Sequence, residues 1–163
     1  MKRILVISDS HGYLNHIREI LKKENPDMII HLGDCVRDVY ELQREFPSHN
    51  IEYVKGNCDI VQEPEEKILL IEDKKILICH GHTYQVKSGY LNIEYAAKEK
   101  QVDAVLFGHT HQAFYNHHNG IVMLNPGSIG FSVLSPASYG WLIIDGDMIK
   151  TDVQFMDLQH GRS

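Results

Sequence analysis

Acidic, amide and imidazole side chains gather in short clusters along the chain, and each cluster follows a run of apolar residues. The clusters read "DSHG" at residues 9–12, "GD" at 33–34, "GNCD" at 56–59, "HGH" at 80–82, "GHTH" at 108–111 and "NPGS" at 125–128. A single cluster of this kind is typical of a turn. Bringing all of them together would carry a large desolvation cost, so their combination indicates a functional site.

The apolar runs before the clusters predict the elements that hold them. Strands are expected at residues 3–8, 28–32 and 51–54, and helical spacing of apolar residues predicts helices at 13–24 and 36–46. Strands that alternate with helices in this way form a parallel sheet with right-handed crossovers. Because ligands bind just outside the carboxyl ends of such strands, we expect the clusters to line one cleft.

The second half of the chain is richer in strands. Residues 66–80 predict a hairpin with its turn at 72–74, followed by a helix at 89–100 and a strand at 103–108. The segments "GIVMLN", "SYGWLIID" and "MIKTDVQFM" predict further strands joined by tight turns. No linker or internal repeat interrupts the sequence, so residues 1–163 are expected to form one α/β domain with a loose tail at "QHGRS".

The composition is that of a globular protein, with 43% apolar and 23% charged residues. No apolar run approaches the roughly 20 residues that span a bilayer, and the first one reads as a strand rather than a leader, so we expect a cytoplasmic protein. Three cysteines without a CxxC pair fit neither a disulfide framework nor a zinc ribbon. The net charge of −6 argues against a broad nucleic-acid-binding surface, but a phosphate substrate is compatible with bound divalent ions.

The donor types in the clusters are suited to divalent metal ions. Carboxylate and imidazole groups with an amide, and without thiolate, suit ions of intermediate character such as Mn²⁺, Fe²⁺ or Zn²⁺. The set is too large for one tetrahedral zinc ion, and a mononuclear zinc hydrolase would leave several ligands unexplained. Seven candidate ligands instead suit two ions that share a carboxylate, an arrangement used in phosphoryl transfer.

The motifs "DSHG", "GD", "GNCD", "HGH" and "GHTH", in this order, resemble the calcineurin-like metallophosphoesterase superfamily over residues 2–145, and most closely its small bacterial and archaeal phosphodiesterases. The resemblance implies a four-layer α/β/β/α sandwich, in which two mixed sheets pack face to face with helices outside. It also implies two groups of ligands. One ion is expected to bind Asp9, His11 and His111, the second Asn57, His80 and His109, and Asp34 is expected to bridge the two.

The resemblance further implies a reaction, an in-line attack on phosphorus by a hydroxide held between the ions, with Asp34 and Asn57 in catalytic roles. We expect Mn²⁺ as the metal, with Ni²⁺, Fe²⁺ and Zn²⁺ as alternatives, and a small phosphodiester or nucleotide-type substrate. The alternative is a protein-interaction scaffold like the retromer subunit of the same fold, but the complete ligand set favours catalysis. The oligomeric state stays open, a homo-oligomer included.

Cys58 departs from the wider superfamily, in which many members have a histidine that is thought to protonate the leaving group. The small phosphodiesterases also have cysteine there, so we interpret Cys58 as a small, mostly structural residue at the rim of the substrate site. His82 or a metal-bound water then supplies the proton. His82 is also a candidate substrate contact, or else a turn residue bonded to the backbone.

Four further residues are expected to support the site or the core. We interpret Cys35 and Cys79 as buried, small apolar residues. A ligating histidine needs a hydrogen-bond partner for its other ring nitrogen, and His31 or Asp59 is expected to serve.

Overall fold

The computed structural model describes residues 1–130 and 136–156, which form two five-stranded sheets. The first sheet has the order β10-β9-β1-β2-β3, with strands β1 (Lys2–Ile7), β2 (Met28–His31), β3 (Ile51–Tyr53), β9 (Ser138–Asp145) and β10 (Met148–Phe155). The second has the order β4-β5-β6-β8-β7, with β4 (Glu66–Ile71), β5 (Lys74–Cys79), β6 (Ala104–Leu106), β7 (Phe114–His118) and β8 (Ile121–Asn125). Both sheets mix parallel and antiparallel pairs.

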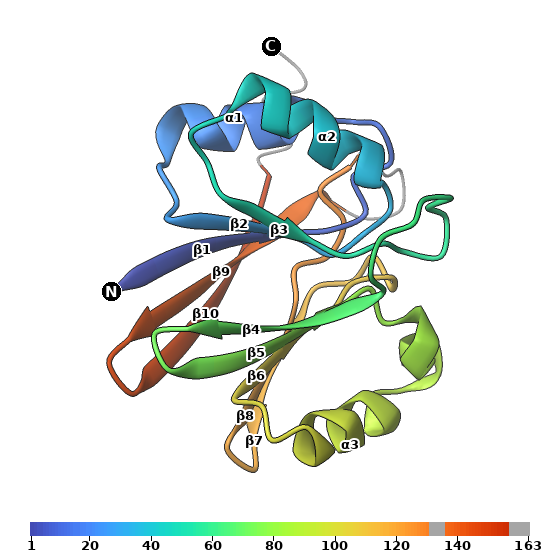
Figure 1. Cartoon of the computed structure of the whole chain (residues 1–163), viewed down its shortest axis with the longest axis vertical. Coiled ribbons are helices and arrows are strands. Elements are labelled where there is room, and N and C mark those ends of the chain that lie inside the picture. The colour runs from blue at the N-terminus through green and yellow to red at the C-terminus, as the bar shows by residue number, and fades with distance from the viewer. Residues whose placement is uncertain (131–135, 157–163) are drawn as a thin grey trace.

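Three helices complete the layers: α1 (Asn15–Lys23), α2 (Val36–Glu45) and α3 (Leu91–Glu99). Figure 1 shows α1 and α2 above the first sheet, α3 below the second, and the two sheets facing each other between them. Two short 3₁₀ turns, His82–Tyr84 and Val86–Ser88, precede α3. The expected four-layer sandwich is therefore confirmed.

Alternating side chains of each central strand explain why the layers form. In β1, Ile4 and Val6 belong to the core between the two sheets, whereas Leu5 and Ile7 belong to the core beneath α1 and α2. A third core packs the second sheet against α3 and contains Cys79, which is buried as predicted. Because successive strand residues point to opposite faces, an uninterrupted apolar run fits a strand that is covered on both sides.

The parallel pairs place the polar clusters at one edge of the sandwich. β1 pairs parallel with β2 in the first sheet, and β6 pairs parallel with both β5 and β8 in the second. The carboxyl ends of the parallel strands within each sheet therefore point the same way. Hydrogen bonds between the two sheets, described below, bring these ends together.

Two details differ from the sequence prediction. β7 is an additional strand, which the pattern does not predict because "FYNHH" is polar and four of its five residues are exposed. The tight turn expected between β8 and β9 is wrong, because β8 ends at Asn125 in the second sheet and β9 begins at Ser138 in the first. The remaining strands and the three helices are confirmed within a few residues. The predicted tail lies outside the described residues.

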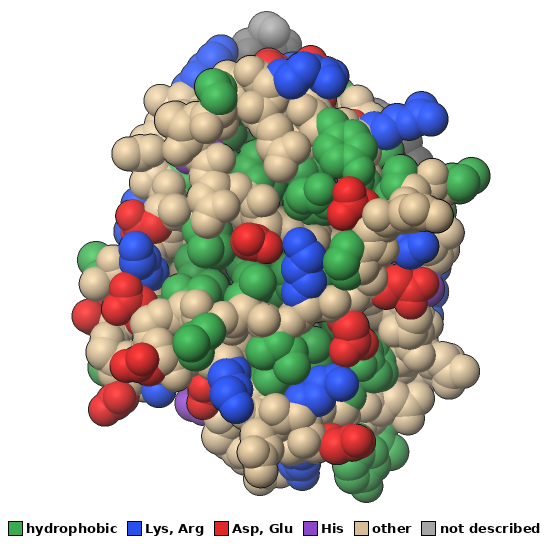
Figure 2. All heavy atoms as spheres, in the orientation of Figure 1, with side chains coloured by type: hydrophobic (Ala, Val, Ile, Leu, Met, Phe, Trp, Pro, Cys, Tyr) green, Lys and Arg blue, Asp and Glu red, His purple; other side chains and the backbone are tan. Residues whose placement is uncertain are grey.

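Figure 2 shows one face of the molecule, on which charged side chains of both signs are interspersed with hydrophobic side chains. This face has no continuous basic surface. Among the described residues, no helix is both long enough and apolar enough to cross a bilayer.

Candidate metal centre

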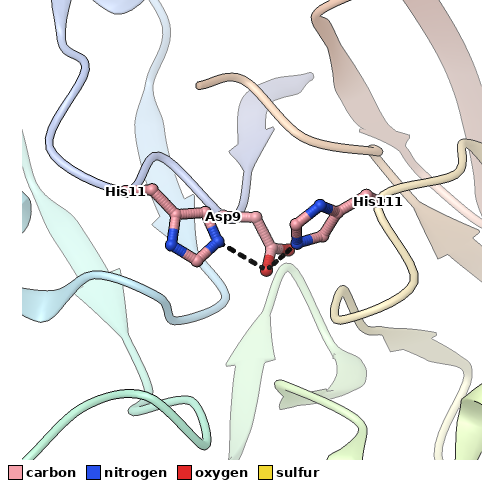
Figure 3. A group of neighbouring side chains, drawn as sticks. All are labelled: Asp9, His11 and His111. Carbon is pink, nitrogen blue, oxygen red and sulfur yellow. Dashed lines mark ion pairs between the residues drawn. The ribbon is translucent and has the colours of Figure 1, made fainter. Parts of the chain in front are cut away.

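The loops that follow β1, β2, β5 and β6 meet at one place and form two overlapping groups of possible metal ligands. In each group the ligand atoms lie within 4.8 Å of one another. The first group contains Asp9, His11 and His111, and Figure 3 shows both imidazoles turned toward one oxygen of the Asp9 carboxylate. The second contains Asp9, Asp34 and His80. Asp9 is therefore common to both groups.

Asp9 is fully buried, and its two carboxylate oxygens differ in their surroundings. Oδ2 accepts hydrogen bonds from the Ser8 hydroxyl at 2.6 Å and the His109 amide at 3.1 Å. Oδ1 has no hydrogen-bond partner among the described residues. Three imidazole Nε2 atoms surround this oxygen, at 3.1 Å for His111, 3.7 Å for His11 and 3.8 Å for His80. A buried, unpartnered carboxylate oxygen faced by imidazole nitrogens fits a bound cation.

His80 joins the two sheets at the second group. Its Nδ1 lies 2.8 Å from the carbonyl oxygen of Leu32, and because a carbonyl only accepts, Nδ1 carries the proton and donates. The Nε2 atom then faces Asp34 Oδ2 at 3.3 Å. This orientation leaves Nε2 available as a metal ligand, as in most metal-binding histidines. The expectation that His31 or Asp59 orients the ligating histidine is wrong for His80, because the partner is the backbone of Leu32.

The remaining predicted ligands border the same place. Nδ1 of His109 lies 3.2 Å from Nε2 of His80. Asn57 is exposed in the loop after β3, and no hydrogen bond of its side chain exists among the described residues. Coordination by His109 and Asn57, and the bridging role of Asp34, stay predictions. Neither of the two ligand groups contains His109 or Asn57, and the residue that they share is Asp9 rather than Asp34.

Five of the candidate ligands have left-handed backbone conformations. The φ angles are +56° at Asp9, +47° at His11, +50° at Asp34, +73° at His109 and +62° at His111. Such angles are uncommon for residues with a side chain, and each costs on the order of 1–3 kcal/mol. Strain of this kind concentrates at binding and catalytic sites, because the surrounding structure holds the side chains in one orientation.

The clustered charges shift the pKa values of the groups. Burial alone would raise the pKa of Asp9, but the neighbouring imidazoles hold it well below its usual range. Burial also opposes ionisation of Asp34, yet His80 lowers its pKa to about 2. In His80 the two carboxylates overcome burial and raise the pKa, whereas burial and His80 lower that of His109 to about 4. Both carboxylates are thus ionised at neutral pH, as metal ligands must be.

A buried hydrogen-bond chain supports the loops after β1 and β2. The Gly33 amide donates to His31 Nδ1 at 3.1 Å, so the proton of the neutral ring is on Nε2, which lies 2.9 Å from the Ser10 hydroxyl. Ser10 then donates to Asp38 Oδ2 at 2.6 Å, and the Gly12 amide donates to the same oxygen at 2.8 Å. His31 is fully buried, and the chain of hydrogen bonds fixes the backbone on both sides of His11.

Two further side chains, outside the predicted ligand set, hold ligand loops in place. Asp59 accepts hydrogen bonds from the amides of Asp34, Val36 and Gly56 at 2.8–2.9 Å. Asn125 in the "NPGS" turn donates to the carbonyl of Gly108 at 3.1 Å and to the Thr110 hydroxyl at 2.9 Å. Because Asp and Asn are common in turns, the sequence alone gives little indication that Asp59 and Asn125 support the site.

His82 and Cys58 occupy the border of the centre. The His82 ring lies 5.5 Å from that of His80 and 6.1 Å from that of His109, and its Nδ1 is buried without a partner among the described residues. Burial, His80 and, to a smaller extent, Lys55 lower the pKa of His82. Cys58 is exposed, and its amide donates to Asp34 Oδ1 at 3.0 Å. Cys35 is half-buried, so its predicted burial is only partial.

Comparison with known proteins agrees with this geometry. Residues 1–147 match the model of the calcineurin-like phosphoesterase superfamily domain. The probable metallophosphoesterase YsnB of Bacillus subtilis is 36% identical over 159 residues, which cover 94% of this chain and 90% of that protein. A phosphodiesterase of Methanocaldococcus jannaschii is 32% identical over 143 residues, covering 77% of this chain and 82% of the relative.

Two solved structures are similar in fold to this chain. A predicted phosphoesterase from Streptococcus pneumoniae has a TM-score of 0.77 and 29% identity, covering 94% of this chain and 89% of its own. Vps29 from Entamoeba histolytica, solved in complex with Zn²⁺, has a TM-score of 0.76 over 94% of this chain and 98% of its own. At 22% identity, the second likeness shows the fold alone. From the match over residues 1–147 and from these relatives, the chain belongs to the calcineurin-like phosphoesterase superfamily.

Proposed function

We propose that this single-domain protein is a cytoplasmic, dinuclear metal-dependent phosphoesterase that prefers phosphodiesters to monoesters. The observation that carries the proposal is the Asp9 carboxylate, which is buried and common to two ligand groups, and of which one oxygen has no hydrogen-bond partner among the described residues. A donor set split into two adjoining groups suits a pair of ions better than one. The name of the Methanocaldococcus jannaschii relative supports the diester preference.

The residues have separate roles in this proposal. His11 and His111 hold one ion with Asp9, and His80, His109 and Asn57 hold the other, with Asp34 between them. When bound, two divalent ions lower the pKa of water and stabilise the charge that develops on the phosphoryl group. The exposed Asn57 amide also donates to a phosphate oxygen. His82 contacts the substrate or moves a proton to the leaving group.

Cys58 takes no nucleophilic part in the proposed reaction. Although Cys58 is exposed, some loss of solvent around the thiol and the neighbouring Asp34 carboxylate raise its pKa, so the thiol stays protonated at neutral pH. The thiol is a small group at the rim, and the Cys58 amide serves the site through its bond to Asp34. Cys58→Ser is expected to change kcat on an activated aryl diester by less than about tenfold, and a thousandfold loss would reject this role.

The experiment that tests the proposal is metal reconstitution of stripped protein. Mn²⁺ is compared with Mg²⁺, Zn²⁺, Ni²⁺ and Fe²⁺ on cyclic nucleotides, other nucleotide diesters and phosphomonoesters. We expect Mn²⁺ to give the highest activity, hydrolysis of diesters before monoesters, and loss of activity with a chelator. Activity that persists after the metal has been removed would contradict the proposal. Metal binding without hydrolysis of any ester would favour the scaffold alternative instead.

A further inference from the structure

The loop between β3 and β4, residues 54–65, carries side chains that the proposed chemistry does not use. Figure 1 shows this loop extending from the ends of the two sheets. Its first part provides Asn57 and Cys58. Two residues after Cys58, the side chain of Ile60 is 99% exposed. An isolated exposed isoleucine is ordinary on a surface, but this one lies within three residues of a proposed ligand.

A hollow of about 400 Å³ lies along this loop, lined by Lys55, Asp59, Ile60, Val61 and Gln62. The ammonium group of Lys55 donates to the Val61 carbonyl at 3.3 Å and has no carboxylate partner within ion-pair distance among the described residues. The Asp59 carboxylate accepts hydrogen bonds from three backbone amides and keeps its negative charge. The hollow therefore offers one ammonium group without an ion-pair partner among the described residues, next to apolar surface.

Two hydrogen bonds connect the loop that borders the hollow to the metal centre. Asp59, which lines the hollow, accepts the amide of Asp34 at 2.9 Å. The Cys58 amide donates to the Asp34 carboxylate at 3.0 Å. The hollow thus shares a loop with Asn57 and Cys58, and this loop contacts the proposed ligand Asp34.

We propose that this hollow binds one alcohol portion of the phosphodiester, and that it selects an alcohol carrying a second anionic group beside an apolar group. Lys55 binds the anion and Ile60 covers the apolar part. A nucleotide-type alcohol with its own phosphate has this combination, whereas a plain alkyl or aryl alcohol lacks the anion. The inference rests on the proposed phosphodiesterase function and adds a substrate class to it.

The test uses two matched diesters that release 4-nitrophenolate. One carries a 4-carboxyphenyl group as its second ester and the other an unsubstituted phenyl group, so they differ only in the added anion. With the Mn²⁺-loaded full chain we expect a kcat/KM ratio of about fivefold in favour of the carboxylate, the upper range for a part-exposed ion pair. The ratio is expected to fall toward one in Lys55→Met and at high salt.

Control variants separate charge from packing. Lys75→Met removes the same charge from an exposed position at the opposite end of β5 from His80, and should keep the wild-type ratio. Ile60→Ser should lower kcat/KM for both diesters by a similar factor. Hydrolysis of both diesters with a ratio near one, or with a ratio that Lys55→Met leaves intact, overturns the inference while the proposed function stands. Hydrolysis of neither diester with any ion overturns the proposed function and the inference together.

Discussion

At the scale of single residues, the two oxygens of Asp9 are used differently. Ser8 and the His109 amide fix Oδ2, so Oδ1 is held among three imidazoles without a hydrogen bond from any residue that the structure describes. Hydrogen bonding through one oxygen orients the other, which is how outer groups prepare a ligand for a metal. Geometry and charge at this one side chain therefore connect the sequence motif "DSHG" to metal binding.

Asp9→Asn tests this connection directly. The amide keeps the shape of the side chain and an oxygen for Ser8, but it removes the negative charge that the two ligand groups share. We expect Mn²⁺ affinity, measured by calorimetry on the stripped protein, to fall by about 100-fold or more. Asp145→Asn, at the exposed end of β9, is the control and should bind as the wild type does. Unchanged affinity in Asp9→Asn would remove Asp9 from the site.

His31 makes the stability of the protein depend on pH. Burial lowers its pKa from 6.5 to about 4, so the unfolded chain takes up a proton at a higher pH than the folded chain does. Its contribution to stability is full above about pH 6.5 and is lost as the pH falls toward 4. The full effect is on the order of 3 kcal/mol.

Chemical unfolding between pH 7 and pH 4 in the presence of a chelator measures this effect. His31→Gln keeps an amide donor for Ser10 but does not titrate, so its stability should fall less steeply than that of the wild type. The difference between the two proteins isolates His31 from His109, which titrates in the same range. If the stability of the two proteins falls equally with pH, His31 is not the cause of the pH dependence.

At the scale of elements, the ligand loops are shaped by close contacts between the backbone of one loop and the side chains of another. Glycine is needed at residue 56, because a Cβ atom there would lie 2.1 Å from Oδ1 of Asp34. Gly108 is similar, since a Cβ would lie 2.1 Å from the Ser8 hydroxyl and 2.8 Å from Oδ2 of Asp9. These glycines let the strand ends approach the carboxylates directly.

Gly56→Ala is expected to displace the Asp34 carboxylate and to weaken Mn²⁺ binding by about tenfold or more. Gly146→Ala serves as control, because a Cβ there meets nothing within 4 Å and reports only the strain of its φ of +59°. Thermal unfolding of both variants separates loss of fold from loss of the site. If a folded Gly56→Ala protein binds Mn²⁺ with normal affinity, the close approach of residue 56 to the Asp34 carboxylate does not matter for the site.

The individual elements also show which parts of the fold and of the candidate site can be predicted from the sequence. The strand of residues 2–7 is evident because an unbroken apolar run fits an element covered on both faces, whereas the exposed β7 carries no such signal. The candidate ligands share motifs and positions at strand ends. The bond from Ser10 to Asp38 has no such signature, because 28 residues separate the partners and only the parallel pairing of β1 and β2 brings their loops together.

At the scale of the whole molecule, the metal centre lies where the two sheets meet. His80 from the second sheet donates to Leu32 of the first, and the His109 amide donates to Asp9 across a separation of 100 residues. Residues proposed to hold an ion between the sheets thus also hold the sheets together. Without the ion, the ionised Asp9 and Asp34 carboxylates are balanced only by neighbouring imidazoles and hydrogen bonds. Metal binding should therefore stabilise the complete fold.

Thermal unfolding with and without Mn²⁺ tests this coupling. An ion at 100 times its Kd stabilises the folded state by about 2.7 kcal/mol, which for a chain of this length raises Tm by roughly 5–10 °C. The shift should grow with Mn²⁺ concentration and disappear with a chelator. It should also be much smaller in Asp9→Asn, whose Tm without metal is expected to be close to that of the wild type, because the amide removes a buried charge and keeps the packing. An equal shift in both proteins would place the stabilising ion elsewhere, since only the shared carboxylate distinguishes them.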